Sequence, residues 1–170
     1  MELLTERLAL RPCTGADRAR LRAIFRDPYV RRYLWDAQLV DFEQVDAVIA
    51  ASAQVLRERG LAIWCATQRG DPRAETIGFA GARPMERGEF ELIYGFLPEH
   101  WGRGFAAEAA RAVIERAFAL GEPRIWAGTD RENKASERVM QQLGMRFDHR
   151  VTVNGLPQVY YVLERPAHAP

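Results

Sequence analysis

The sequence predicts an α/β fold in which about four helices flank a mixed, mostly antiparallel sheet of six to seven strands. The 170 residues are 48% hydrophobic, which is enough to bury one core. Segments with alternating apolar residues, typical of strands, occur among longer segments with the periodicity of amphipathic helices. Three of the strand segments follow one another across short turns, and this order favours an antiparallel meander.

A strand is expected at residues 6–11, where apolar and polar residues alternate before a proline. Thr14 and Asp17 have the spacing of a capping box and predict the start of a helix, which Pro28 limits. The fold is therefore expected to open with a strand followed by a helix.

A second helix is expected between Asp41, a residue type that caps helix N-termini, and Gly60, a residue type that ends helices. Turn signals at 70–72 and 87–88 separate the strands that follow. We expect these strands, which form the predicted meander, at residues 61–68, 75–83 and 89–97.

The last part of the chain alternates helices and strands. A stripe of small and apolar residues predicts a helix over 106–118, closed by Gly121. Asn133 is expected to cap a further helix, which runs to Leu143. The Asn-Gly pair at 154–155 predicts the turn of a terminal hairpin. The remaining strands are expected at 124–129, 145–153 and 157–165.

We interpret residues 1–165 as a single domain and residues 166–170 as a flexible tail. The 24 basic and 23 acidic side chains give a net charge of +1, so no global field favours nucleic acid or a membrane surface. No apolar segment has the roughly 18 residues that span a bilayer, and no targeting segment is found, so we expect a cytoplasmic protein. Cys13 and Cys65 are expected to be free thiols, and no Cys/His cluster has the spacing of metal ligands.

The strand expected at 89–97 runs into a turn with Gly102 and Gly104, and a helix follows at once. The first N–H groups of a helix lack intrahelical partners and attract anions, and glycines let the backbone approach a diphosphate closely. We therefore expect a nucleotide-like or coenzyme ligand here. Residues 102–107 also satisfy the dinucleotide pattern G-x-G-x-x-A, with Asp130 as a ribose-binding acid. That interpretation is disfavoured, because four residues separate the strand from the first glycine and too few βα units follow.

Three sequence blocks together resemble the GCN5-related N-acetyltransferase (GNAT) superfamily. Within it they are most similar to the branch of ribosomal-protein-alanine N-acetyltransferases, the RimJ/RimL-like proteins. The blocks follow the family's order and spacing across nearly the whole chain. They are TERL at 5–8 with LRP at 10–12, ELIY at 91–94 through PEHWGRGFA at 98–106 to EA at 108–109, and NKASERV at 133–139 through LGM at 143–145.

The resemblance implies acetyl-coenzyme A (acetyl-CoA) as cosubstrate and an amine as acceptor. It also implies that the strand at 89–97 splays from the strand at 124–129, with the pantetheine arm in the gap. The family's diphosphate signature begins with Gln or Arg, whereas Trp101 stands there in this sequence and leaves most of the binding to main-chain amides. Arg103 is expected either to bond a phosphate or to be a solvated turn residue. The coenzyme-binding residues that the resemblance implies are Phe96, Leu97, Gly102, Arg103, Gly104, Phe105, Ala106, Asn133 and Ser136.

Transfer to an amine requires that the acceptor ammonium, with a pKa of about 8 to 10, loses a proton and that the leaving thiolate gains one. Glu91 matches the branch's recurrent acid and is the candidate general base; the alternative is a glutamate on an exposed strand face. Ser136 is the branch's candidate acid. The phenols of Tyr160 and Tyr161 suit protonation of the thiolate better, or they pack the hairpin.

The sequence thus predicts direct acetyl transfer from acetyl-CoA to a primary amine, either a protein N-terminal α-amine or a small amine. Tyr29, Tyr33 and Trp35 are candidates for the acceptor pocket or for the core. An alternative function is a non-catalytic acyl-CoA-binding sensor, which keeps the glycine turn but lacks a productive base. The exposed edges of the C-terminal hairpin can pair with a second copy of the chain, but an edge strand alone does not establish a homodimer.

Overall fold

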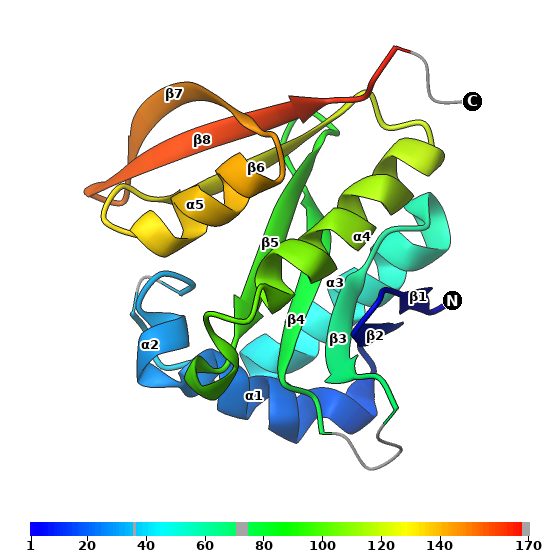
Figure 1. Cartoon of the computed structure of the whole chain (residues 1–170). Coiled ribbons are helices and arrows are strands. Elements are labelled where there is room, and N and C mark those ends of the chain that lie inside the picture. The colour runs from blue at the N-terminus through cyan, green and yellow to red at the C-terminus, as the bar shows by residue number, and fades with distance from the viewer. Residues whose placement is uncertain (36, 71–74, 168–170) are drawn as a thin grey trace.

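The computed structural model describes residues 1–35, 37–70 and 75–167 (Figure 1). In these residues the chain forms an eight-stranded sheet with the order β1-β2-β3-β4-β5-β6-β8-β7. Every neighbouring pair is antiparallel except β5 with β6. The strands are β1 (Leu3–Leu4), β2 (Leu8–Pro12), β3 (Ile63–Gln68), β4 (Gly78–Pro84), β5 (Phe90–Phe96), β6 (Arg124–Asp130), β7 (Arg146–Val153) and β8 (Leu156–Glu164). The predicted α/β fold with a mostly antiparallel sheet is therefore confirmed, and such a sheet excludes a doubly wound dinucleotide-binding fold.

The sheet has more strands than the predicted six to seven, because β1 adds a two-residue strand at one edge. Two residues are too few to show an alternating pattern in a sequence. β2 begins at Leu8, later than the predicted start at residue 6, because the chain turns at Thr5, whose hydroxyl accepts the Leu8 N–H at 2.9 Å. The predicted turn at 70–72 and the predicted tail at 166–170 lie partly outside the described residues.

The described residues contain five α-helices, one more than predicted, and two 3₁₀ turns. The additional helix, α2, is a single turn that begins at Pro28, where the Asp27 carboxylate accepts two main-chain N–H groups. The capping box of Thr14 and Asp17 is present, but it opens a 3₁₀ turn that leads into α1. The helices are η1 (Gly15–Asp17), α1 (Arg18–Arg26), α2 (Pro28–Arg31), α3 (Phe42–Arg59), η2 (Pro98–His100), α4 (Phe105–Ala119) and α5 (Lys134–Gln142).

Several predicted caps and turns are confirmed. Asp41 and Gln44 form a capping box at the start of α3, and Gly60 ends this helix with a left-handed backbone, at a φ of 71°. Asn133 caps α5 by accepting a main-chain N–H in its first turn. The hairpin turns at 154–155, where both residues have positive φ, as a tight two-residue turn requires.

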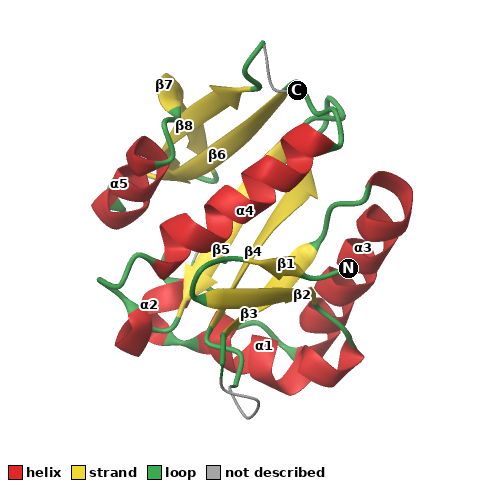
Figure 2. Cartoon of the chain, turned by 45° about the vertical axis from the view of Figure 1, so that its right-hand side comes forward, coloured by secondary structure: helices red, strands yellow, loops and turns green. Residues whose placement is uncertain are grey.

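Helices cover both faces of the sheet (Figures 1 and 2). α4 and α5 lie on one face, where Val113 and Met140 join the larger core cluster. α1 and α3 lie on the opposite face, around a second cluster that includes Val45. Successive side chains of β5 divide between the two clusters, since Leu92 belongs to the first and Ile93 packs against the second.

β5 and β6 separate toward their C-terminal ends, as predicted. β5 pairs with β4 over seven residues and β6 pairs with β8 over seven, yet β5 and β6 pair only at Glu91 and Trp126. Figure 1 shows the two ribbons diverging beyond this contact. The backbone of β5 after Glu91 therefore faces a gap on this side instead of a neighbouring strand.

Candidate active site

The gap between β5 and β6 opens into a cleft of about 1350 Å³. Its walls come from α2, β5, β6, the turn before α4 and the first residues of α5. Pockets for small ligands have volumes of about 300–1000 Å³, so this cleft has room for a larger molecule. The predicted coenzyme residues that line it are Phe96, Gly102, Gly104, Phe105, Ala106, Asn133 and Ser136.

The glycine turn and the start of α4 bring main-chain N–H groups to this cleft. Gly102 and Gly104 both have left-handed backbone, with φ of 71° and 78°. Gly104 is the N-cap of α4 and has no side chain to occupy the amides of residues 105–107, which also lack partners within the helix. No atom lies within 4 Å of the position that a Cβ would take on Gly102. This geometry fits a diphosphate, because free amides and the helix dipole both favour an anion.

Arg103 and Trp101 are held by contacts within the protein. The Arg103 guanidinium donates to Gln68 Oε1 at 3.1 Å and lies 4.6 Å above the Phe105 ring. The Trp101 indole donates to the Phe96 C=O at 2.6 Å. Arg103 therefore lies beside the cleft and not in its lining, with partners of its own, and its contact with a phosphate stays a prediction.

Phe96 and Leu97 differ in what their backbones can offer a coenzyme. The Leu97 N–H donates to the Ile77 C=O at 3.0 Å and extends the ladder between β4 and β5. In an antiparallel ladder, successive residues direct their backbone groups to opposite sides. The Phe96 N–H therefore faces the gap toward β6, whereas Leu97 has no N–H left to offer. Of the two expected backbone contacts, Phe96 stays a prediction that the geometry allows.

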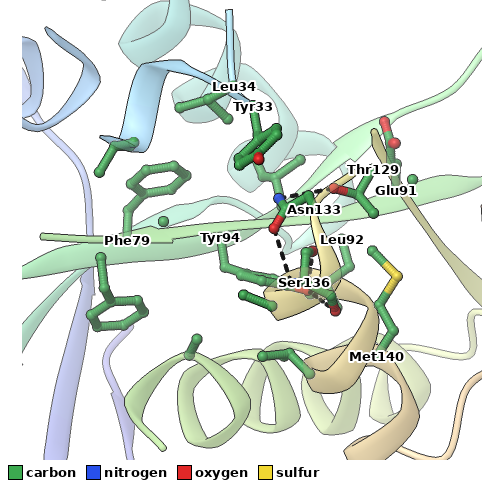
Figure 3. Close-up of a pocket in the computed structure, with 18 of the residues that line it drawn as sticks. Tyr33, Leu34, Phe79, Glu91, Leu92, Tyr94, Thr129, Asn133, Ser136 and Met140 are labelled. Atoms are coloured by element: carbon green, nitrogen blue, oxygen red, sulfur yellow. Dashed lines mark hydrogen bonds between the residues drawn. The ribbon is translucent and has the colours of Figure 1, made fainter. Parts of the chain in front are cut away.

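Asn133 and Ser136 lie one turn apart at the start of α5 and face the cleft (Figure 3). Asn133 donates its side-chain amide to Thr129 Oγ1 at 3.1 Å and accepts the Ser136 N–H at 3.2 Å. Ser136 Oγ lies 2.8 Å from the hydroxyl of Tyr94 on β5. Burial raises the pKa of Tyr94 to about 12, although the hydrogen bond with Ser136 acts in the opposite direction. The Tyr94 phenol is therefore protonated at neutral pH and brings a proton to this pair.

Glu91 is almost fully buried, with 6% of its surface exposed, where β5 and β6 meet. Its Oε2 accepts the Arg83 Nε–H at 2.7 Å, and its Oε1 lies over Gly128 of β6. Glu89, on the same strand face, accepts the Trp126 indole N–H at 3.0 Å instead and does not line the cleft. The structure therefore brings Glu91 and not Glu89 into the cleft, and an exposed strand-face glutamate does not describe Glu91.

Tyr160 and Tyr161 point to opposite faces of β8. Tyr160 lines the cleft, and its ring stacks on His149 with the ring centroids 5.1 Å apart. Burial raises the pKa of Tyr160, and the charge of nearby Glu91 raises it further. The Tyr161 hydroxyl donates to Glu137 Oε2 at 3.1 Å, on the other face. Tyr160 is therefore the member of this pair that can act in the cleft.

Aromatic residues of α2 and the segment after it line one part of the cleft. Figure 3 shows Tyr33 among the lining residues. Tyr29, Tyr33 and Trp35 all line it, which is where an acceptor pocket is expected. Tyr29 meets the ring of Trp101 edge to face, at a centroid distance of 6.1 Å. This contact joins the expected acceptor wall to the glycine turn.

Gly128 and Tyr94 are site residues that the sequence analysis missed. A Cβ on Gly128 would lie 2.7 Å from Tyr160 Cζ and 2.9 Å from Glu91 Oε1, well inside normal contact distance. The missing side chain lets a carboxylate and a phenol lie together over β6. An isolated glycine in a strand pattern indicates such a close approach and was the signal for Gly128. The pairing of Tyr94 with α5 has no comparable signal in the sequence.

Comparison with known proteins identifies the family. The model of a family described as the acetyltransferase (GNAT) domain matches residues 7–146 of this chain. The chain belongs to the GNAT acetyltransferase family. The uncharacterized N-acetyltransferase YoaA of Bacillus subtilis is 33% identical to this GNAT chain over 146 residues, which are 85% of this chain and 82% of YoaA. The predicted superfamily is therefore confirmed.

Among the solved structures that share the fold of this GNAT acetyltransferase are two that contain a coenzyme. RimL, a ribosomal L7/L12 α-N-protein acetyltransferase in complex with coenzyme A, has a TM-score of 0.81 at 14% identity, over 96% of this chain and 98% of RimL. YncA of Salmonella typhimurium, solved with its cofactor acetyl-CoA, has a TM-score of 0.74 at 20% identity, over 96% of each chain. At these identities the likeness shows the fold alone. None of the helices in the described part of this GNAT chain has the length and apolar character needed to cross a bilayer.

Proposed function

We propose that the protein transfers the acetyl group of acetyl-CoA directly to a primary amine, with Glu91 as the general base. One observation carries this proposal: the free amides at the start of α4 and the Glu91 carboxylate line the same cleft. Glu91 lies where β5 meets β6, and the amides follow the other end of β5. The amides suit a diphosphate, and the carboxylate suits an ammonium group that must lose a proton. The acceptor is a protein N-terminal α-amine, as for the RimJ/RimL-like branch, or a small amine.

The donor half of the proposed site consists mainly of main-chain groups. Gly102, Gly104 and the amides of residues 105–107 are proposed to bind the diphosphate, and the Phe96 N–H is proposed to bind the pantetheine arm. Asn133 and Ser136 face the gap from α5 and complete this half. The coenzyme complexes of RimL and YncA, which share the fold, support the placement.

Glu91 is proposed to take the proton of the acceptor ammonium, directly or through a water molecule. An ammonium with a pKa of about 8 to 10 is mostly protonated at neutral pH and needs a base before its nitrogen can attack. Arg83 holds one oxygen of the carboxylate, and the other lies over Gly128. The freed amine then attacks the thioester carbonyl carbon and forms the C–N bond. The nitrogen gives up its second proton to water, and the C–S bond breaks to leave the amide and the coenzyme thiolate.

The leaving thiolate needs a proton, and two hydroxyl groups of the cleft are candidate donors. They are Ser136, which is hydrogen-bonded to Tyr94, and Tyr160. We assign the role to Ser136, because the hydrogen-bonded Tyr94 hydroxyl can replace the proton that Ser136 gives up. Tyr94 lies on β5 between Glu91 and Phe96. Tyr160 lies beside the base instead.

Gly128→Ala tests whether the proposed base must lie close against β6. The new Cβ would displace Glu91 Oε1 or Tyr160, so we expect kcat to fall about tenfold, since small displacements of reacting groups slow catalysis strongly. The Kd for acetyl-CoA should stay within about twofold, because the glycine turn is untouched. Gly15→Ala is the matched control, since a Cβ there meets no atom within 4 Å. An unchanged kcat in Gly128→Ala would contradict the proposed placement of Glu91.

The ion pair between Glu91 and Arg83 favours one alternative function, a non-catalytic acyl-CoA-binding sensor. A carboxylate already held by a guanidinium is partly neutralised and offers less to an incoming ammonium. Such a protein would bind the coenzyme through the same amides and transfer nothing.

Thiol release from acetyl-CoA, measured with a panel of acceptors, separates these functions. The panel pairs peptides that have a free N-terminal amine with the same peptides blocked at that amine, and adds polyamines, amino acids and aminoglycosides. We expect thiol release only when an acceptor is present. Its rate should saturate as the concentration of an acceptor from one of these classes rises. Release with free but not blocked peptides would assign a protein N-terminus as acceptor. Coenzyme binding without turnover across the panel would support the sensor and contradict the enzyme.

A further inference from the structure

The turn between β1 and β2 binds the first turn of α4. Thr5 donates its hydroxyl to Glu108 Oε1 at 2.6 Å, and the Arg7 main-chain N–H donates to the same oxygen at 2.8 Å. The Arg7 guanidinium donates to Glu108 Oε2 through Nε at 2.7 Å and pairs with it through Nη2 at 2.6 Å. One carboxylate on α4 is therefore held by two neighbouring residues from the other end of the chain.

Arg7 also fixes the peptide that precedes the N-cap of α4. Its Nη1 donates to the Arg103 C=O at 2.8 Å, and a Cβ on Gly104 would lie 3.4 Å from its Nη2. In a planar trans peptide the C=O and the following N–H point in opposite directions. With the Arg103 C=O held on the side of Arg7, the Gly104 N–H is turned away from Arg7. Gly104 lines the cleft and Arg7 does not, so Arg7 holds this peptide from outside the cleft.

Glu108 places a negative charge in the first turn of α4, near the proposed diphosphate site but outside the lining of the cleft. It lies in the first turn of α4, where the helix dipole favours a carboxylate as well as any other anion. Burial opposes its ionisation, but hydrogen bonds from Thr5 and Arg7 outweigh burial and hold the pKa of Glu108 below its ordinary value. Glu108 is therefore an anion at neutral pH, and the charge that neutralises it is that of Arg7.

We propose that Arg7 is a positioning residue for the coenzyme, which neutralises Glu108 and aims the Gly104 N–H at the diphosphate without touching the coenzyme itself. This inference rests on the proposed acetyl-CoA site. It gives the TERL block at 5–8 a role in coenzyme binding, although Arg7 is not part of the cleft. It also gives the two partners of one ion pair opposite effects on coenzyme binding, since Arg7 assists a bound anion and Glu108 repels it.

Calorimetric titration of coenzyme A into variants of Arg7 and Glu108 tests whether the two residues affect the Kd in opposite directions. We expect Arg7→Gln to weaken binding about tenfold, because Glu108 is no longer neutralised and the Arg103–Gly104 peptide is released. Glu108→Gln should keep the Kd within about twofold, because Arg7 retains its bond to the Arg103 C=O and no carboxylate remains. The double variant should bind more tightly than Arg7→Gln alone, because the repulsive charge is gone.

Steady-state kinetics separate positioning from a general loss of structure. Arg7→Gln should raise the KM for acetyl-CoA about tenfold and leave kcat within about twofold, because the groups proposed to react are unchanged. Arg111→Gln is the matched control. Arg111 is an exposed arginine of the same helix, donates to the Gln142 C=O at 3.2 Å and should affect neither constant.

Equal losses of binding in Arg7→Gln and Glu108→Gln would overturn the proposal, because an ion pair that is merely structural depends on both partners alike. Unchanged binding in Arg7→Gln would overturn it as well. Arg7→Lys is a second variant for the case that Arg7→Gln does not fold. Lysine keeps the positive charge but cannot bond both Glu108 and the Arg103 C=O. We therefore expect its Kd for coenzyme A to lie between the wild-type value and the value expected when both bonds and the charge are lost. A wild-type protein that binds no coenzyme A would remove the proposed function itself, whereas wild-type binding with equal losses removes this inference alone.

Discussion

Replacing Glu91 with glutamine is expected to lower kcat about 10²- to 10⁴-fold, which is the usual contribution of a general base. Glutamine has the shape of glutamate and still accepts a hydrogen bond from Arg83, but it cannot take the ammonium proton. The Arg83 side chain is 60% exposed, so water replaces its lost ionic partner and the fold is retained. Thiol release at saturating acceptor measures kcat, and calorimetry should show a Kd for acetyl-CoA within about twofold of the wild-type value.

Glu89→Gln is the matched control for this change, because Glu89 shares the strand face of Glu91 but bonds Trp126 outside the cleft. It should leave kcat within about twofold. Full activity of Glu91→Gln would show that water or another group takes the proton.

Local signals were sufficient to predict most of the fold and the glycine turn that leads into α4. Asp41 and Gly60 mark the ends of α3, because each satisfies backbone groups that a helix end leaves without partners. The glycines at 102 and 104 predict an anion site for the same reason, since strand, turn and helix start are consecutive there. Such requirements extend over a few residues and can be recognised in a sequence.

Contacts between distant segments decide the rest of the site and could not be predicted. Tyr94 meets α5 across 42 residues, and Arg7 meets α4 across 101 residues. Sheet order and helix placement create these contacts, and no local pattern encodes them. Whether Tyr160 or Tyr161 faces the cleft depends on strand register, because a shift of one residue exchanges the two faces. The sequence left this choice open, and the fold selects Tyr160.

Gly104→Val is expected to weaken acetyl-CoA binding by more than about 100-fold, because it removes the geometry on which the main-chain site depends. Gly104 has a φ of 78°, in a region that costs a non-glycine residue roughly 1–2 kcal/mol and a β-branched residue more. Relief of this strain would turn the peptide and move the first amides of α4 away from the diphosphate. Gly121→Val is the matched control, because Gly121 follows the other end of the same helix with a φ of 94° and carries similar strain outside the cleft.

Isothermal titration of acetyl-CoA into the wild type, Gly104→Val and Gly121→Val tests most directly whether main-chain amides at the start of α4 bind the coenzyme diphosphate. We expect saturable binding at one site in the wild type and in Gly121→Val, and no measurable binding in Gly104→Val at the same concentrations. A folded wild-type protein that takes up no acetyl-CoA, or a Gly104→Val variant with wild-type affinity, would contradict this claim.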